Sequence, residues 1–297
     1  MNYFIMLSVK NITKEYLEKI FKKTKDIIKY KNYYLKERKI LVNAFFEPST
    51  RTSLSFESAM YKLGGDVVTF NQDLSSLKKG ESFEDTIKSI SSYGDIMVMR
   101  HPEKGAMEKA SELSNIPIIN AGDGNGEHPT QAILDMYTIY RKFPDLENLK
   151  VLFVGDIINS RTIHSLVDLF SLYPRNKLFF LPYNRSSPHL KYLYNIGYIH
   201  GQIPDDMLIN QIDLDISEYD IVYMTRMQKE RRETAISPNF ILTPELADQM
   251  KKKSLIMHPL PRNEELPHSV DSNKRAVYFD QMRYGLYIRM ALLEDLT

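Results

Sequence analysis

Short apolar runs alternate with longer amphipathic segments along this chain. Eight runs of five to seven residues have the length, and the content of β-branched and aromatic side chains, of buried strands. They lie at residues 40–46, 66–70, 95–100, 116–120, 150–155, 177–182, 220–225 and 254–258. Strands that alternate with helical segments predict the α/β class, with parallel sheets and crossover helices.

The segments between these runs carry apolar residues at three- and four-residue spacing, which predicts helices with one buried face. Two such faces are clear. The first consists of Phe56, Ala59, Met60 and Leu63, and the second of Ile133, Met136, Tyr137 and Tyr140. Gly64 and Gly65 should end the first helix, and Pro129 suits the first turn of the second.

A polar stretch at residues 141–150 contains a proline and separates the first four predicted strands from the last four. We therefore expect two domains, at residues 1–142 and 143–297, each a parallel sheet flanked by helices. The last segment, about 281–296, has a helical pattern. We expect this C-terminal helix to pack back across the domains, onto the first one.

Composition narrows the class of protein. The 297 residues are 43% hydrophobic, enough for two cores, and 39 basic residues nearly cancel 38 acidic ones, so no global field attracts nucleic acid or a membrane. No apolar run approaches the roughly 20 residues of a membrane span. Cysteine is absent, which excludes disulfides, thiol nucleophiles and thiolate metal sites. We expect a cytosolic enzyme that uses oxygen, nitrogen and charge.

Lysines cluster at residues 14–29, where apolar residues recur at roughly helical spacing. A nucleic-acid or membrane contact is one interpretation of such a basic segment. It would need aromatic residues or further basic patches on the same face. An amphipathic surface helix is the favoured interpretation.

Polar residues follow the predicted strands of the first half. In open parallel sheets, ligands bind beyond the carboxyl ends of strands, where helix N-termini present backbone N–H groups. Residues 47–52 (EPSTRT), 100–102 (RHP) and 127–131 (EHPTQ) occupy such places. Ser and Thr there could be ordinary N-caps. Three similar strand ends instead favour an anion site, with the ring of His128 aimed at it.

The second half repeats this arrangement. Arg161 and Arg226 follow the strands at 150–155 and 220–225, and residues 258–262 (HPLPR) follow the last strand. Arginines at neighbouring strand ends suit a small dicarboxylate, although any one of them could be a surface arginine paired with a nearby acid. Gly155 is not followed by the further glycines of a dinucleotide site, so a nicotinamide cofactor is disfavoured.

The ordered motifs resemble those of the catalytic chain of the aspartate carbamoyltransferase family over nearly the whole length. They are Phe45–Thr52, Lys78–Glu81, Arg100–Pro102, Gly122–Gly124, His128–Gln131, Arg161–Thr162, Tyr223–Arg231 and His258–Arg262. The resemblance implies an enzyme of pyrimidine biosynthesis that transfers a carbamoyl group from carbamoyl phosphate to L-aspartate. It implies neither a metal nor an organic cofactor.

The resemblance also implies residue roles. Carbamoyl phosphate would be bound by Ser49, Thr50, Arg51, Thr52, Ser75, Arg100, His128, Gln131, Pro259 and Leu260, and aspartate by Lys79, Arg161, Arg226 and Gln228. The catalytic residues would be Arg51, Thr52, Lys79, Arg100 and His128. Ser75 and Lys79 would enter the site of a neighbouring subunit, which implies a homotrimer with shared sites. Glu47 and Arg231 would help to hold the two domains closed around substrate.

Several alternatives stay open at this point. Ornithine-using relatives carry a His-Cys-Leu-Pro motif and a Ser-Met-Gly loop, both absent here, and a catalytically silent assembly subunit is the alternative from another class. Ser76 competes with Ser75 for the neighbouring site. Glu127 would raise the pKa of His128 if its carboxylate faced the ring. Nothing in the sequence indicates a regulatory chain or a pathway-enzyme partner.

Overall fold

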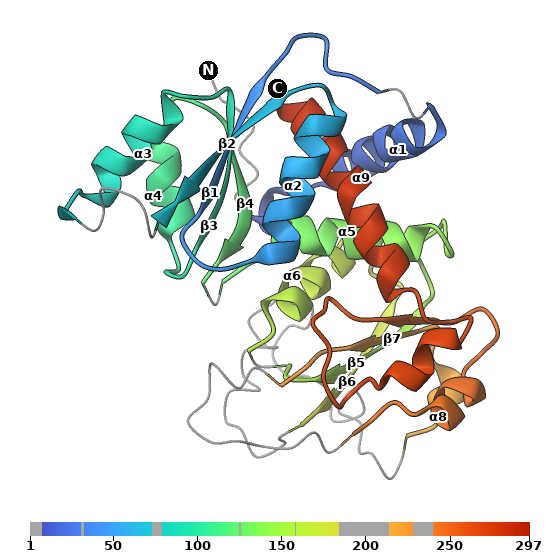
Figure 1. Ribbon diagram of the computed structural model, residues 1–297. Helices are drawn as coiled ribbons and strands as arrows, with labels where there is room; N and C mark the ends of the chain where they lie inside the picture. The colour runs from blue at the N-terminus through green and yellow to red at the C-terminus, as the bar shows by residue number, and fades with distance from the viewer. Residues whose placement is uncertain are drawn as a thin grey trace. The chain divides into compact units, whose positions relative to one another are not determined.

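The computed structural model describes residues 8–30, 33–72, 79–124, 126–157, 159–183, 214–227 and 240–297 (Figure 1). The chain forms two compact units, Met1–Leu134 with Arg283–Thr297, and Asp135–Met282. The division falls within helix α5 (Pro129–Tyr140), eight residues before the predicted boundary at 142. The polar stretch at 141–150 therefore lies inside the second unit.

All eight predicted strands are present, four parallel strands in each unit. The first sheet has the order β2-β1-β3-β4 and consists of β1 (Ile40–Phe45), β2 (Asp66–Asn71), β3 (Ile96–His101) and β4 (Ile118–Asp123). The second has the order β6-β5-β7-β8 and consists of β5 (Lys150–Gly155), β6 (Lys177–Pro182), β7 (Ile221–Met224) and β8 (Leu255–Met257).

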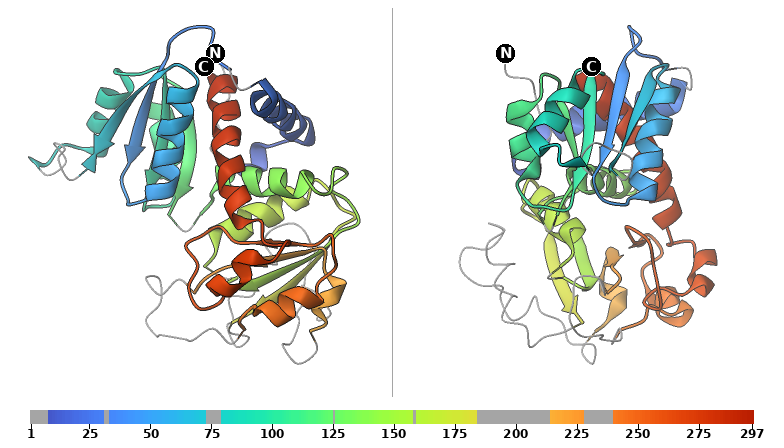
Figure 2. Two further views of the ribbon diagram at one scale, coloured as in Figure 1. Left: turned by 45° about the vertical axis from the view of Figure 1, so that its right-hand side comes forward. Right: turned by 60° about the vertical axis from the view of Figure 1, so that its left-hand side comes forward.

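In the first unit, helices cover both faces of the sheet. Helices α3 (Phe83–Ser91) and α4 (Ala106–Leu113) lie on one face and α2 (Thr50–Lys62) on the other (Figures 1 and 2). Side chains of β1 alternate between them: Val42 and Ala44 join the core with α3 and α4, whereas the amide of Asn43 reaches α2. The four apolar residues predicted to face the sheet from α2 are all buried.

Helix α1 (Lys14–Tyr30) is the lysine-rich segment, and it is amphipathic as predicted. Leu17 and Ile20 are fully buried, and the lysines lie on the other side. Lys19 and Lys23 form ion pairs with Asp295 at N···O distances of 2.6 and 3.1 Å. Asp295 lies on α9 (Tyr278–Leu296), whose residues from Arg283 onward belong to the first unit. The expectation that this C-terminal helix packs back onto the first unit is confirmed.

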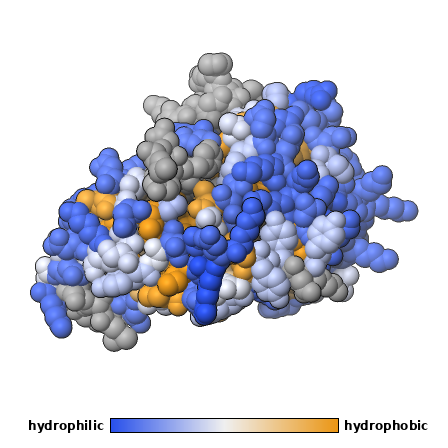
Figure 3. All heavy atoms as spheres, turned by 90° about the horizontal axis from the view of Figure 1, so that it is seen from above, coloured by the Kyte–Doolittle hydropathy of each residue, from blue (hydrophilic) through white to orange (hydrophobic). Residues whose placement is uncertain are grey.

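In the second unit, α8 (Pro244–Gln249) packs on one face of the sheet through Ala247. Helix α6 (Arg161–Phe170) packs on the other, where Phe153 of β5 and Phe170 lie 6.5 Å apart between ring centroids. In the part of the chain that the structure describes, no helix is long and apolar enough to cross a membrane. The face seen in Figure 3 is mostly hydrophilic, with hydrophobic residues in small separate patches.

Two local predictions were wrong. Helix α5 was expected to bury one face, but positions 132–139 are all buried, so it is an interior helix. Strand β4 was expected to end at residue 120, before a glycine-rich loop. It continues to Asp123, because Asp123 still pairs with His101 of β3.

The buried histidine of α6 gives a pH-dependent stability. The His164 ring lies with Nε2 2.8 Å from the carbonyl oxygen of Ile157, and burial lowers the pKa of His164 to about 4. Between this value and 6.5, the ordinary value, the unfolded chain binds the extra proton. The fold should therefore lose stability as pH falls from about 6.5 to 4, by roughly 3 kcal/mol in total.

His164→Gln keeps a donor near the Nε2 position and cannot be protonated. The measured quantity is the unfolding free energy of the unsubstituted protein minus that of the variant, from denaturant titrations. This difference should decrease as pH is lowered from about 6.5 to 4. A difference that does not change with pH would contradict the assignment of a neutral, buried His164.

Candidate active site

Each sheet has one place where the strand order reverses, between β1 and β3 in the first unit and between β5 and β7 in the second. At such a point the connections leave neighbouring strands toward opposite sides, and ligands of open α/β sheets bind beyond these strand ends. Several of the predicted site residues lie there: Ser49–Thr52 after β1, Arg100 in β3, Arg161 after β5 and Arg226 after β7.

The start of α2 is the first component. Ser49 occupies the N-cap position, but its side chain makes no capping hydrogen bond, so the ordinary N-cap interpretation fails for this residue. The first backbone N–H groups of a helix have no partner within the helix and lie at its positive dipole end. Arg51 is exposed and Thr52 is buried in this first turn. This arrangement suits a phosphate group.

A buried polar contact fixes this helix start on the sheet. The Asn43 side chain is fully buried in β1, and its Nδ2 donates to Ser53 Oγ at 2.9 Å and to Glu57 Oε1 at 2.7 Å. Thr69 of β2 donates to the same Glu57 oxygen at 3.2 Å. Strands β1 and β2 therefore hold the N-terminal half of α2 through Ser53 and Glu57.

Arg100 is the second component. Its Nε lies 2.6 Å from Glu47 Oε1, and the two side chains are only 13% and 21% exposed. The backbone N–H of Phe46 donates to the Arg100 carbonyl oxygen at 2.8 Å, which joins the ends of β1 and β3. Glu47 thus pairs with Arg100 within the first unit. Its expected role with Arg231 stays a prediction, since Arg231 lies outside the described residues.

His128 immediately precedes α5, and Pro129 is the first residue of that helix, as predicted. The ring is buried, and the His128 carbonyl oxygen accepts hydrogen bonds from the N–H groups of Gln131 and Ala132. The carboxylate of Glu127 accepts from Ser8 Oγ at 2.8 Å and from the Val9 N–H at 2.6 Å. It therefore faces the N-terminal segment, and the contact with the His128 ring that we considered is not formed.

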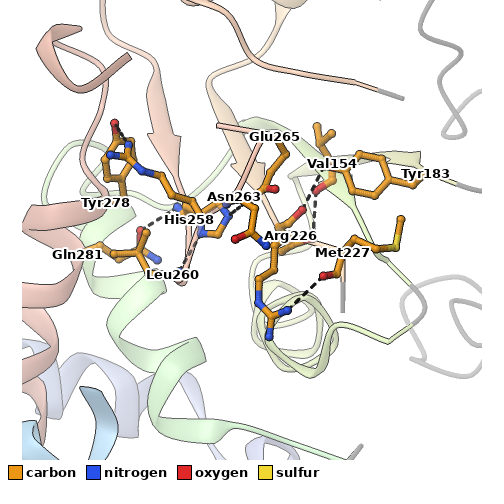
Figure 4. A network of polar contacts seen from close by, with 12 residues as sticks. Val154, Tyr183, Arg226, Met227, His258, Leu260, Asn263, Glu265, Tyr278 and Gln281 are labelled. Carbon is orange, nitrogen blue, oxygen red and sulfur yellow. Dashed lines mark hydrogen bonds and ion pairs between the residues drawn. The ribbon is translucent and has the colours of Figure 1, made fainter. Parts of the chain in front are cut away.

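In the second unit, a close backbone approach brings β5 and β7 together. Gly155 has φ 123°, and a Cβ atom there would lie 2.3 Å from the carbonyl oxygen of Thr225. Arg161 then begins α6 with a buried side chain, and Arg226 is half-buried two residues after β7. In Figure 4 the guanidinium of Arg226 donates through Nη1 to the Met227 carbonyl oxygen, at 3.1 Å. Two guanidinium groups thus follow neighbouring strands.

The HPLPR turn after β8 contributes backbone groups more than side chains. Pro259 and Leu260 are half-buried. Arg262 is held by Asp271, whose Oδ2 lies 2.7 Å from Nη2, and by the Tyr278 hydroxyl at 2.9 Å from Nη1. The hydrogen bond from Arg262 keeps the pKa of Asp271 well below its ordinary range. Arg262 therefore serves the structure of the turn.

Some predicted residues are not placed. Ser75, Ser76 and Gln228 lie outside the described residues. Lys79 is exposed in the segment before α3. Among the described residues, no group of three or more His, Asp or Glu side chains could hold a metal ion. Sequence reasoning missed three buried polar residues near the HPLPR turn, which are Asp135, Glu265 and Gln281. Only Asp135 has a sequence signal, as an acidic residue between the apolar Leu134 and Met136.

Two family models together match most of the chain. The model described as "Aspartate/ornithine carbamoyltransferase, carbamoyl-P binding domain" matches residues 5–141, and that described as "Aspartate/ornithine carbamoyltransferase, Asp/Orn binding domain" matches residues 147–296. The chain belongs to the aspartate/ornithine carbamoyltransferase family. The first model covers most of the first unit and the second model most of the second, although residues 283–296 belong to the first unit and to the second model.

Two of three similar proteins have names that contain aspartate. The chain is 42% identical to the aspartate carbamoyltransferase catalytic subunit of Clostridium novyi, over 94% of this chain and 93% of that protein. It is 41% identical to the multifunctional protein CAD of Squalus acanthias, but spans only 13% of that protein. The aspartate transcarbamoylase of Trypanosoma cruzi, solved with carbamoyl phosphate and aspartate, has a TM-score of 0.81 and 33% identity, over 98% of this chain and 95% of that chain.

The approach of Gly155 to Thr225 can be tested by adding a methyl group. Gly155→Ala should destabilise the fold by about 3 kcal/mol or more, because it combines a disfavoured positive φ with overlap onto a backbone oxygen. Gly105→Ala is the matched control, with φ 89° and nothing within 4 Å of the added Cβ, and should cost about 1 kcal/mol. Equal losses in thermal unfolding would show that the approach does not constrain the fold.

Proposed function

We propose that this chain transfers the carbamoyl group of carbamoyl phosphate to the amine of L-aspartate, giving N-carbamoyl-L-aspartate and phosphate for pyrimidine biosynthesis. The observation that carries the proposal is the placement of hydroxyl and arginine side chains at both points of strand-order reversal. Solved relatives bind carbamoyl phosphate and aspartate, which supports the same substrates here. A cytosolic location stays a prediction.

The first unit would bind carbamoyl phosphate. Its phosphate would lie at the start of α2, and its carbonyl oxygen near Thr52, Arg100 and His128. The carbamoyl amide would donate to the side chain of Gln131 and to backbone carbonyl groups of Pro259 and Leu260. The remaining residues of this proposed set are Ser49, Thr50, Arg51 and the neighbouring subunit's equivalent of Ser75.

In the reaction, the amine nitrogen of aspartate forms a bond to the carbamoyl carbon and generates a tetrahedral centre with an oxyanion. Thr52, Arg100 and His128 would stabilise this charge, and Arg51 the charge of the leaving phosphate. The carbon–oxygen bond to phosphate then breaks, and the amine proton passes to the phosphate. Holding two anionic substrates side by side removes much of the entropic barrier.

The choice of amine rests on charge. Arg161 and Arg226 follow the two central strands of the second sheet, and with Gln228 and Lys79 they would bind the two carboxylates of aspartate. Ornithine would place a second ammonium group near guanidinium groups, which is electrostatically unfavourable. Its use is therefore disfavoured. A silent assembly subunit is disfavoured too, because the arginines and the histidine that the chemistry needs are all retained.

We include a homotrimer with shared sites in the proposal. Exposed apolar side chains on the first unit support it: Leu54 and Tyr61 lie two turns apart on α2, with 55% and 59% exposure, and Val68 lies on the edge strand β2, with 43% exposure. Edge strands with exposed apolar side chains are common sites of association. Lys79 is exposed in the same unit, where it could reach a neighbouring chain.

The phosphate assignment can be tested at Arg51. Arg51→Ala should lower kcat by about 10²–10³-fold and leave the fold intact, because the side chain is exposed and stabilises charge on the substrate. Arg38→Ala is the matched control, since this arginine is exposed in the same unit and pairs with Asp66. It should leave kcat unchanged. Full turnover by the Arg51 variant would refute the assignment.

Sharing of sites can be tested by mixing inactive variants. Lys79→Ala and Arg51→Ala chains, dissociated and reassembled together, should regain part of the activity, because some sites then combine an intact Arg51 with an intact Lys79 from the neighbour. A mixture of Arg51→Ala and Arg100→Ala chains should stay inactive, since both residues would belong to the same chain's part of each site. No recovery in the first mixture, with subunit exchange demonstrated by mass, would count against shared sites.

A further inference from the structure

His258 forms a specific hydrogen-bond arrangement at the end of β8. Its side chain is fully buried, and each ring nitrogen has a partner (Figure 4). Nδ1 lies 2.8 Å from the backbone nitrogen of Leu260, and Nε2 lies 3.1 Å from Oε1 of Glu265. The same Glu265 oxygen accepts a hydrogen bond from the Asn263 N–H at 2.8 Å. The ring thus links the HPLPR turn to a buried carboxylate.

These partners determine the tautomer of the ring. A backbone N–H can only donate, so Nδ1 must be the acceptor and the proton of the neutral ring lies on Nε2, where it is donated to Glu265. Burial lowers the pKa of His258, which keeps the ring neutral. Burial opposes ionisation of Glu265, but the hydrogen bonds from His258 and the Asn263 N–H outweigh it and lower the pKa of Glu265. A neutral imidazole therefore contacts a carboxylate.

The ring also determines the direction of a carbonyl group. The Pro259–Leu260 peptide is trans and planar, so the Pro259 C=O points opposite to the Leu260 N–H and hence away from the imidazole. Leu260 has φ 57°, a left-handed conformation. This conformation is unfavourable for a residue with a branched side chain, so other interactions must stabilise it. The hydrogen bond from the Leu260 N–H to His258 Nδ1 is one such interaction.

The backbone of His258 is held from the other side. Its N–H donates to Gln281 Oε1 at 3.1 Å, and Gln281 Nε2 donates to Asp135 Oδ1 at 2.5 Å. The second oxygen of Asp135 accepts the hydroxyl proton of Tyr223 at 2.6 Å. All of these side chains are buried. The backbone of His258, at which the turn begins, is therefore held in place by buried hydrogen bonds.

We propose that His258 and Glu265 are positioning residues for carbamoyl phosphate, which orient the Pro259–Leu260 peptide so that its carbonyl oxygen accepts a hydrogen bond from the carbamoyl amide. Neither side chain touches the substrate. The inference rests on the proposed function, in which this backbone binds the amide, and it adds the residues that make the backbone competent to do so.

Two substitutions separate the two hydrogen bonds of the ring. In His258→Asn, Oδ1 takes the place of Nδ1 and still accepts from the Leu260 N–H, but the side chain is too short to reach Glu265. In His258→Gln, the amide can reach Glu265 but offers no acceptor at the Nδ1 position. Both variants remove the imidazole, so any general effect of losing the ring should appear in both and cancel when the two are compared.

The ligand comparison isolates the amide. Carbamoyl phosphate and acetyl phosphate share the phosphate and the carbonyl group and differ in NH₂ against CH₃, so the ratio of their Kd values reports the contacts of the NH₂ group. His258→Gln should lower the preference for carbamoyl phosphate roughly tenfold, the effect of one hydrogen bond, with little change for acetyl phosphate. His258→Asn should retain most of the preference. Glu265→Gln, which keeps an acceptor for Nε2–H, should retain it as well, whereas Glu265→Met should lower it.

Amide hydrogen exchange at Leu260 reports the turn independently of any ligand. Exchange should accelerate in His258→Gln and stay slow in His258→Asn. Unchanged exchange in His258→Gln would overturn the inference itself. Faster exchange with an unchanged ligand preference would instead overturn the proposed contact between this turn and the carbamoyl amide. An equal loss of affinity for both ligands in both His258 variants would show a general structural role and would also overturn the inference.

Discussion

The reversal of strand order at the centre of each sheet is the constraint on which the rest of the structure depends. Parallel strands need crossover connections, and these are almost always right-handed, so a reversal sends consecutive helices to opposite faces of the sheet. Helices α2 and α4 lie on opposite faces of the first sheet for this reason (Figure 1). Within the described ranges of the chain, no loop therefore crosses over the carboxyl ends of β1 and β3, and the same holds for β5 and β7.

This geometry dictates where charge can be placed. The central strands are buried on both faces, so ionic side chains are tolerated only where the strands end or where each charge has a partner. Arg100 at the end of β3 is paired with Glu47, and the buried Glu265 is paired with His258. The substrates proposed here are anions, and the positive groups that would bind them lie at these strand ends. Fold and chemistry are thus linked through the same few positions.

The sequence predicted those features of the fold that depend on the local pattern of apolar and polar residues. The eight strands followed from apolar runs, because most of them are buried and buried strands have little choice of composition. Ser49–Thr52 and Arg100 followed from their places after those runs. The division of the compact units within α5 has no sequence signal, because a helix that is buried on all sides has the same apolar pattern before and after Leu134. Local spacing carries no information about such a division.

Contacts between distant residues were equally inaccessible. The partners of Glu127 lie 119 and 118 residues earlier in the chain, and Gln281 is 146 residues from Asp135. His258 and Glu265 are close in sequence, but their hydrogen bond depends on the conformation of the turn between them. Such networks are specified by packing, which periodicity does not report.

Carbamoylation by the purified chain tests the central claim most directly. The chain is supplied with carbamoyl phosphate and either L-aspartate or L-ornithine, and the carbamoylated amino acid and phosphate are measured together. The account predicts equal amounts of N-carbamoyl-L-aspartate and phosphate with aspartate, and no product above background with ornithine. Product with ornithine would contradict the roles of Arg161 and Arg226, and no product with either amine would contradict catalysis by this chain.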